Sequence, residues 1–130
     1  WIFLKGASQS TTAFGFGLTQ YGQYGQSIVL MGGGVAYLTP IIVPTGGAYV
    51  ACVFSPSTAD IYVNGQDKLQ LHYNIGADSS GDWAIGANVP DGSNSNFTGT
   101  IDDVAVYNYG LTADQIMRHY MIGLGYSVPS

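Results

Sequence analysis

Glutamate is absent from the sequence, because all eight of its acidic residues are aspartate. Chemistry that depends on a Glu acid, base or nucleophile is therefore excluded for this chain. Basic residues are also scarce, with three Lys and Arg in total and a net charge of −5. A surface so poor in Lys and Arg cannot neutralise a phosphate backbone, so neither nucleic acid nor an anionic membrane is expected as a partner.

Cysteine and long apolar runs are equally scarce. The single cysteine, Cys52, lies in the apolar run 49–54, where a thiol is expected to pack as a small hydrophobe. A reactive thiol or an external disulfide is the alternative. No stretch approaches the roughly 18 apolar residues of a membrane-spanning helix, and no signal-peptide pattern is present. Because the first residue is Trp1 rather than Met, we expect an upstream segment that is absent from this sequence.

Glycine and tyrosine, by contrast, are abundant, with 19 and 10 residues, while only 8% of residues are charged and 46% are apolar. This composition favours many short strands joined by tight turns over amphipathic helices. A chain of 130 residues is within the size range of one domain. The sequence therefore predicts a single all-β domain over residues 1–130.

Runs of alternating apolar residues predict strands along most of the chain. The predicted strands cover residues 1–4, 13–18, 27–31, 34–43, 49–55, 59–64, 69–74, 83–87 and 98–109. Residues 21–26 form a low-complexity stretch that predicts a hairpin loop, with an assembly or glycan-stacking patch as the alternative. Asn64 and Gly65 form a strong hairpin-turn dipeptide, and Pro40 indicates a sheet edge or a bend.

One helix is predicted near the C-terminus. Thr112 and Gln115 have the spacing of a capping box, which marks the start of a helix that is expected to end near Tyr120. Ile116 and Tyr120 are four residues apart, so they share a face that would cover one end of the sandwich. Arg118 would then lie near the helix C-terminus, where a positive charge is favourable.

Three stretches occur in a specific order: 61–65 (Ile-Tyr-Val-Asn-Gly), 83–86 (Trp-Ala-Ile-Gly) and 97–108 (Phe-Thr-Gly-Thr-Ile-Asp-Asp-Val-Ala-Val-Tyr-Asn), followed by the predicted helix. This set resembles the C-terminal part of the laminin-G-like, concanavalin A-like lectin superfamily. The resemblance implies an antiparallel jelly-roll β-sandwich with one short C-terminal helix, and it predicts an inward face for Val104 and Val106. The family's first strands have no counterpart here. An upstream segment or a neighbouring subunit is therefore expected to complete the sheets beside Trp1 to Leu4.

The same superfamily includes laminarinase-type glucanases, which carry two Glu and an Asp on one strand. The absence of Glu argues against a glycoside hydrolase here. Asp102 and Asp103 are consecutive on a predicted strand and would point to opposite faces, which favours a structural role over a ligand or metal site. His72 and His119 have neither a nucleophile pattern nor zinc-ligand spacing. The sequence therefore predicts that the chain is not an enzyme.

Two kinds of binding site are suggested by the resemblance. Relatives often hold calcium through loop oxygens, for which the candidates are Asp78, Asp82 and Asp91, although turn residues that bond their own backbone are the simpler interpretation. Glycan binding needs an aromatic plate with amide groups beside it, and core packing is the alternative role for such aromatic residues. The candidate ligand-binding residues are Trp83, Tyr73, Tyr109, Asn94 and Asn96.

We therefore expect a non-catalytic adhesion module that binds glycan or protein through loops at one rim of the sandwich. Its place would be extracellular, on a cell surface or on a virion surface. The alternative is a structural subunit, such as a capsid decoration or tail appendage of a virion. Low charge, Gly and Tyr richness and an incomplete jelly roll fit both interpretations, which rest partly on analogy between folds.

Overall fold

The computed structural model of the chain describes residues 2–5, 14–20, 22–32, 35–72, 83–86 and 97–127. Its strands form two antiparallel sheets, and one helix follows them. The strands are β1 (Phe3–Lys5), β2 (Phe14–Gln20), β3 (Gln26–Gly32), β4 (Val35–Ile42), β5 (Val50–Phe54), β6 (Thr58–Val63), β7 (Gln66–His72) and β8 (Trp83–Ile85), and the helix is α1 (Ala113–Gly123). The predicted jelly-roll β-sandwich with one short C-terminal helix is confirmed.

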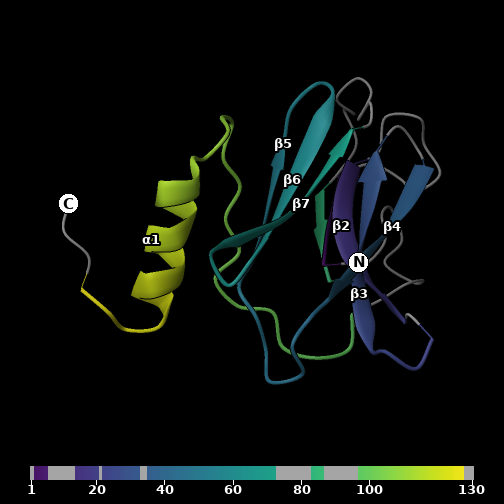
Figure 1. Cartoon of the computed structure of the whole chain (residues 1–130), viewed down its shortest axis with the longest axis horizontal. Helices are drawn as coiled ribbons and strands as arrows, with labels where there is room; N and C mark the ends of the chain where they lie inside the picture. Colours follow the sequence, from purple (N-terminus) through teal and green to yellow (C-terminus); the bar gives the residue numbers. More distant parts are fainter. Residues whose placement is uncertain are drawn as a thin grey trace.

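The five-stranded sheet has the order β4-β3-β2-β1-β8, and the three-stranded sheet has the order β5-β6-β7. The two sheets face each other, and α1 lies beyond the three-stranded sheet (Figure 1). Within the larger sheet, Phe3 of β1 is paired with Phe16 on one side and with Ile85 on the other. The open edges of the described strands are therefore at β4, β8, β5 and β7 rather than beside β1, where the sequence predicted a completing strand.

The hairpins follow the local turn signals. Asn64 and Gly65 have φ values of 52° and 78°, the left-handed conformation that a two-residue turn of the Asn-Gly type requires. This turn lets β7 begin at Gln66, directly opposite Val63, instead of at the predicted residue 69. At the other predicted hairpin loop, Gln20 pairs with Gln26, so the loop prediction for this stretch is confirmed.

The core lies between β3 and β6. Ile28 and Leu30 from β3 meet Ala59, Ile61 and Val63 from β6, and all five are between 0% and 4% exposed. Alternate residues of the two strands supply this contact because side chains one position apart in a strand point to opposite faces. Burial of these side chains holds the two sheets together.

The predicted last strand, residues 98–109, is wrong. Phe97 N–H donates to Gly86 O at 2.7 Å, but no main-chain hydrogen bond joins residues 98–111 to any other part of the chain that the structure describes. Val104 and Val106, expected to point inward, are 43% and 56% exposed. Strand conformation needs a partner edge for its N–H and C=O groups, and none of the described strands provides one for this segment (green in Figure 1).

Helix α1 begins as predicted. The Gln115 N–H donates to Thr112 Oγ1 at 3.2 Å, and the Thr112 N–H donates to Gln115 Oε1 at 2.9 Å, which completes the capping box. Ile116 is fully buried. The ring of Tyr120 lies 6.2 Å from that of Tyr49, so the predicted face does pack against the sandwich.

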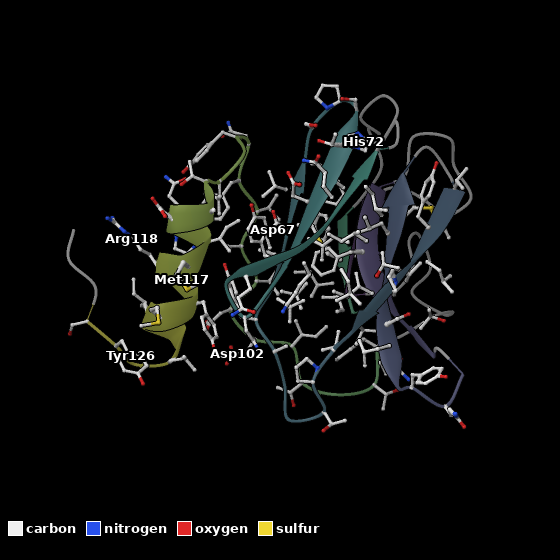
Figure 2. All side chains as sticks on the ribbon, in the orientation of Figure 1. Asp67, His72, Asp102, Met117, Arg118 and Tyr126 are labelled. Carbon is white, nitrogen blue, oxygen red and sulfur yellow. The ribbon has the colours of Figure 1, made fainter. Side chains whose placement is uncertain are left out.

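The end of α1 differs from the prediction, because the helix continues to Gly123 and no basic residue lies in its last turn. Arg118 therefore lies in the middle of the helix, on the side that faces away from the sheets (Figure 2). It is not placed to interact with the helix C-terminus as expected. Among the described residues, no helix has the length and apolar character needed to cross a membrane.

Candidate functional site

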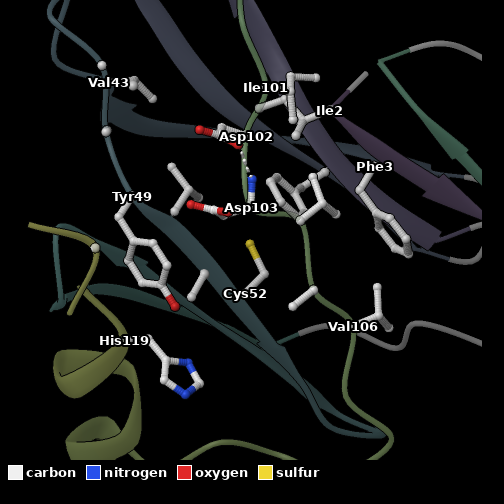
Figure 3. Close-up of a pocket in the computed structure, with 18 of the residues that line it drawn as sticks. Ile2, Phe3, Val43, Tyr49, Cys52, Ile101, Asp102, Asp103, Val106 and His119 are labelled. Atoms are coloured by element: carbon white, nitrogen blue, oxygen red, sulfur yellow. Dashed lines mark hydrogen bonds between the residues drawn. The ribbon is translucent and has the colours of Figure 1, made fainter. Parts of the chain in front are cut away.

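An open groove of about 2030 Å³ lies between the two sheets on the side of residues 97–111 (Figure 3). One wall consists of apolar side chains from the larger sheet and the residue before it, namely Ile2, Phe3, Phe16 and Leu18. The opposite wall is β5, and residues 100–111 run along the opening. No main-chain hydrogen bond joins residues 100–111 to β5 or to another described strand.

Two carboxylates face this groove. The sequence predicted that Asp102 and Asp103 would point to opposite sides, and this prediction is wrong. Asp103 has a φ of 52°, which interrupts the alternation of an extended chain, and its N–H donates to Asp102 Oδ1 at 2.9 Å. Both carboxylates point to the same side of the segment, towards Val43 and Tyr49 (Figure 3). Of the described residues that line the groove, none is Lys or Arg.

Three rings gather where the segment meets α1, and we call Tyr107, Tyr109 and His119 the aromatic cluster. Tyr107 and Tyr109 meet edge to face with ring centres 5.7 Å apart, and Tyr107 stacks on His119 at 5.8 Å. Tyr109 is 59% exposed and Tyr107 is 42% exposed, so solvent reaches both residues. Tyr49 also lines the groove. Burial is the main cause that raises the pKa of its hydroxyl, and the interaction with Tyr107 raises it further.

Cys52 lies on β5 and lines the same groove. Burial raises the pKa of its thiol to about 12. The thiol is therefore neutral at physiological pH and is a poor nucleophile. Its packing against the core cluster agrees with the predicted role as a small hydrophobe.

The structure places only some of the predicted site residues. Tyr109 belongs to the aromatic cluster, and Trp83 begins β8 at the edge of the larger sheet. The other candidates lie outside the described residues, so the calcium site and the rest of the glycan site stay predictions: Tyr73, Asn94, Asn96, Asp78, Asp82 and Asp91. Within the described part of the chain, no group of three or more His, Cys, Asp or Glu residues could hold a metal ion.

The sequence interpretation missed Tyr107 and His119. Tyr107 precedes Tyr109 by two residues, a spacing that brings alternate side chains of an extended segment to one side. His119 follows the buried Ile116 by three residues, which places it on the same face of α1. These spacings were visible, but the contact between the segment and the helix depends on how α1 docks.

The family assignment follows from the whole chain rather than from this site. The sequence profile described as "Concanavalin A-like lectin/glucanases superfamily" matches residues 1–117, which include both sheets and the start of α1. The chain belongs to the concanavalin A-like lectin/glucanase superfamily. The resemblance inferred from residues 61–65, 83–86 and 97–108 is thereby confirmed.

A comparison of this superfamily member with solved structures finds a crystal structure of an S-layer domain-containing protein (residues 221–444) from Clostridium thermocellum ATCC 27405. The two share 19% sequence identity with a TM-score of 0.48, over 91% of this chain and 60% of the other. The chain thus spans less than two thirds of that structure. No match was found among the curated proteins.

Proposed function

We propose that the chain is a non-catalytic module, displayed outside the cytoplasm on a surface, that binds glycan at the aromatic cluster. The observation that carries this proposal is the arrangement of Tyr107, Tyr109 and His119, whose rings meet while Tyr107 and Tyr109 stay exposed to solvent. Membership of a superfamily that includes lectins supports it. The superfamily also includes glucanases, so the chemistry of the site has to distinguish the two.

The site offers both kinds of contact that a sugar needs. A sugar ring has an apolar C–H face that packs on an aromatic ring, and its hydroxyls need hydrogen-bond partners. The tyrosine hydroxyls donate and accept, the exposed Asn108 supplies both donors and an acceptor, and Asp102 and Asp103 supply acceptors along the groove. A saccharide stacked on Tyr109 would therefore have the amide of the neighbouring Asn108 beside it, with further acceptors along the same segment.

The same residues argue against hydrolysis. A glycoside hydrolase places two carboxyl groups on either side of the bond that it cleaves. Asp102 and Asp103 are consecutive, joined by the hydrogen bond from the Asp103 N–H, and they point to one side. With no Glu in the sequence and a neutral Cys52 thiol, the groove supports binding rather than catalysis.

A glycan array tests this proposal, with the purified chain applied first in calcium and then with a chelator. We expect saccharide-selective binding that Tyr109→Ala weakens by about tenfold or more. Tyr126→Ala is the matched control, because Tyr126 is 58% exposed but lies beyond α1. A blank array in both conditions, or equal losses in the two variants, would contradict glycan binding at the cluster. Loss of binding in chelator alone would support the predicted calcium site.

A second candidate is a structural subunit of a larger assembly, such as a virion appendage. The exposed apolar side chains of Val104 and Val106 beside an open groove favour it, because soluble monomers rarely leave contiguous apolar surface uncovered. Under this proposal the native protein copurifies with a large particle. A particle-free monomer that binds sugar would exclude it.

A further inference from the structure

One border of the groove is a segment with the sequence of a β-strand that pairs with no described strand. Residues 104–109 (Val-Ala-Val-Tyr-Asn-Tyr) are rich in β-branched and aromatic residues, which favour strands. Their N–H and C=O groups make no main-chain hydrogen bond to any other described residue. On the far side of the groove, β5 is the terminal strand of its sheet. Such edges are templates for the main chain of another strand.

The size and lining of the groove indicate what fits there. Pockets for small molecules have volumes of roughly 300–1,000 Å³, whereas this groove has about 2030 Å³. Its walls are apolar and come from both sheets, with Phe16 and Leu18 on one side and Val50 to Phe54 on the other. A large, mostly apolar groove bordered by unpaired main chain suits an extended polypeptide better than a compact ligand.

The charge in the groove indicates which kind of polypeptide would bind there. Asp102 and Asp103 both face it, and the described lining contains no Lys or Arg to balance them. Opposite charge on an occupant would be attracted to this position, and like charge would be repelled. The occupant should therefore carry a Lys or Arg near the two carboxylates.

We propose that this groove binds an extended strand of a different polypeptide, which pairs through its main chain with residues 104–109 and places a basic side chain beside Asp102 and Asp103. This mode of recognition adds a strand to an open edge, and pockets for alternate side chains provide specificity. A second copy of this chain is a poor occupant, because its net charge is −5 and it has only three basic residues. The inference does not rest on glycan binding, although both proposals use residues 102–109.

The probe is an acetylated, amidated nine-residue peptide, Ser-Val-Thr-Val-Lys-Val-Thr-Val-Ser, labelled with fluorescein and titrated by anisotropy against the whole chain. Its matched control carries Glu in place of Lys. We expect the Lys peptide to bind about tenfold more tightly than the Glu peptide. Asp102→Asn with Asp103→Asn should remove this preference. These two side chains are exposed, so the substitutions should leave the fold intact, as circular dichroism can verify.

A pair of proline variants tests the main-chain pairing itself. Consecutive residues of a strand direct their N–H groups to opposite sides, so either Ala105→Pro or Val106→Pro removes a donor that the bound strand needs. We expect one of the two to weaken peptide binding by about tenfold or more, while Val106→Thr, which keeps the N–H, does not.

Each outcome bears on the proposal. Absence of binding up to about 1 mM peptide would overturn it. So would an affinity that changes neither when Glu replaces Lys in the peptide nor in the two proline variants. A concentration-dependent dimer that the Lys peptide dissociates would show that a second copy fills the groove, which would overturn the choice of a different polypeptide. A positive peptide result with a blank glycan array would reject glycan binding alone.

Discussion

The Cys52 thiol shows how its surroundings change an ordinary side chain. Burial raises its pKa from 9.0 to about 12, so the folded protein holds the thiol proton more tightly than the unfolded chain does. The unfolded chain then loses this proton first as pH rises above about 9, and the free energy of unfolding falls. Well below pH 9 both states keep the proton, so this thiol contributes no pH dependence there.

We therefore predict that stability decreases by about 1 kcal/mol from pH 8 to pH 10 through this thiol. Urea unfolding across this range measures the decrease, and Cys52→Val should show a shallower slope. The comparison with this variant is needed because burial also raises the pKa of Tyr49 and Tyr62, which act in the same direction. Identical slopes in the two proteins would contradict the assignment.

Two buried hydroxyls on neighbouring strands, those of Thr39 and Ser27, differ in their hydrogen bonding. The Thr39 hydroxyl donates to Ile28 O at 2.7 Å, whereas the buried Ser27 hydroxyl has no hydrogen-bond partner among the described residues. We predict that Thr39→Val lowers the free energy of unfolding by about 1–2 kcal/mol, and that Ser27→Ala leaves it unchanged or raises it slightly. Urea unfolding of both variants checks this. A large loss in Ser27→Ala would reveal a partner for that hydroxyl.

At the scale of elements, the β6–β7 turn and α1 fit closely together. A Cβ at Gly65 would lie 2.8 Å from Met117 Sδ, and Gly65 has a φ of +78°. We predict that Gly65→Ala destabilises the protein by about 1–3 kcal/mol, measured by thermal or urea unfolding. Gly46→Ala is the control, because no atom lies within 4 Å of its Cβ position. The double variant with Met117→Ala should recover the part of the loss that is steric.

The elements that could be predicted from sequence are those that a few neighbouring residues determine. The Asn64-Gly65 turn and the Thr112 capping box depend on contacts within three residues, and the structure has both. Pro40 was expected at an edge, and β4 is the outer strand of its sheet. Residues 98–109 fit a strand equally well by alternation, but a strand needs a partner edge, and the local sequence does not show whether one is present.

The candidate site was predictable to a smaller extent for the same reason. Tyr109 was named as a candidate aromatic residue of a glycan site, but its contact with Tyr107 and the stack of Tyr107 on His119 were not predicted. Those contacts join a segment without strand partners to a helix, and they arise only when Ile116 is buried against the sandwich. Likewise, the shared direction of Asp102 and Asp103 follows from the left-handed φ of Asp103, which an Asp residue adopts only in particular surroundings.

At the scale of the whole molecule, stability should be concentrated in the two paired sheets and not in the unpaired segment. We predict that Val106→Thr changes the free energy of unfolding by less than about 0.5 kcal/mol, because Val106 is 56% exposed. Ile61→Ala should cost about 2–5 kcal/mol, because Ile61 is fully buried between the sheets. Urea unfolding compares the two. A large loss in Val106→Thr would show that the segment is already paired in solution.

The position of β1 between β2 and β8 also has a consequence for synthesis of the chain. Phe3 is synthesised long before Ile85, which is one of its strand partners. Contacts between residues far apart in sequence form slowly, and a growing chain folds from its N-terminal part as it emerges. While translation proceeds, β1 has β2 on one side and an open edge on the other, whereas β5, β6 and β7 can pair as consecutive hairpins. The smaller sheet is therefore expected to form on the ribosome before β8 is added to the larger one. Until β8 has been synthesised and pairs with β1, the β1 edge is exposed to other nascent chains.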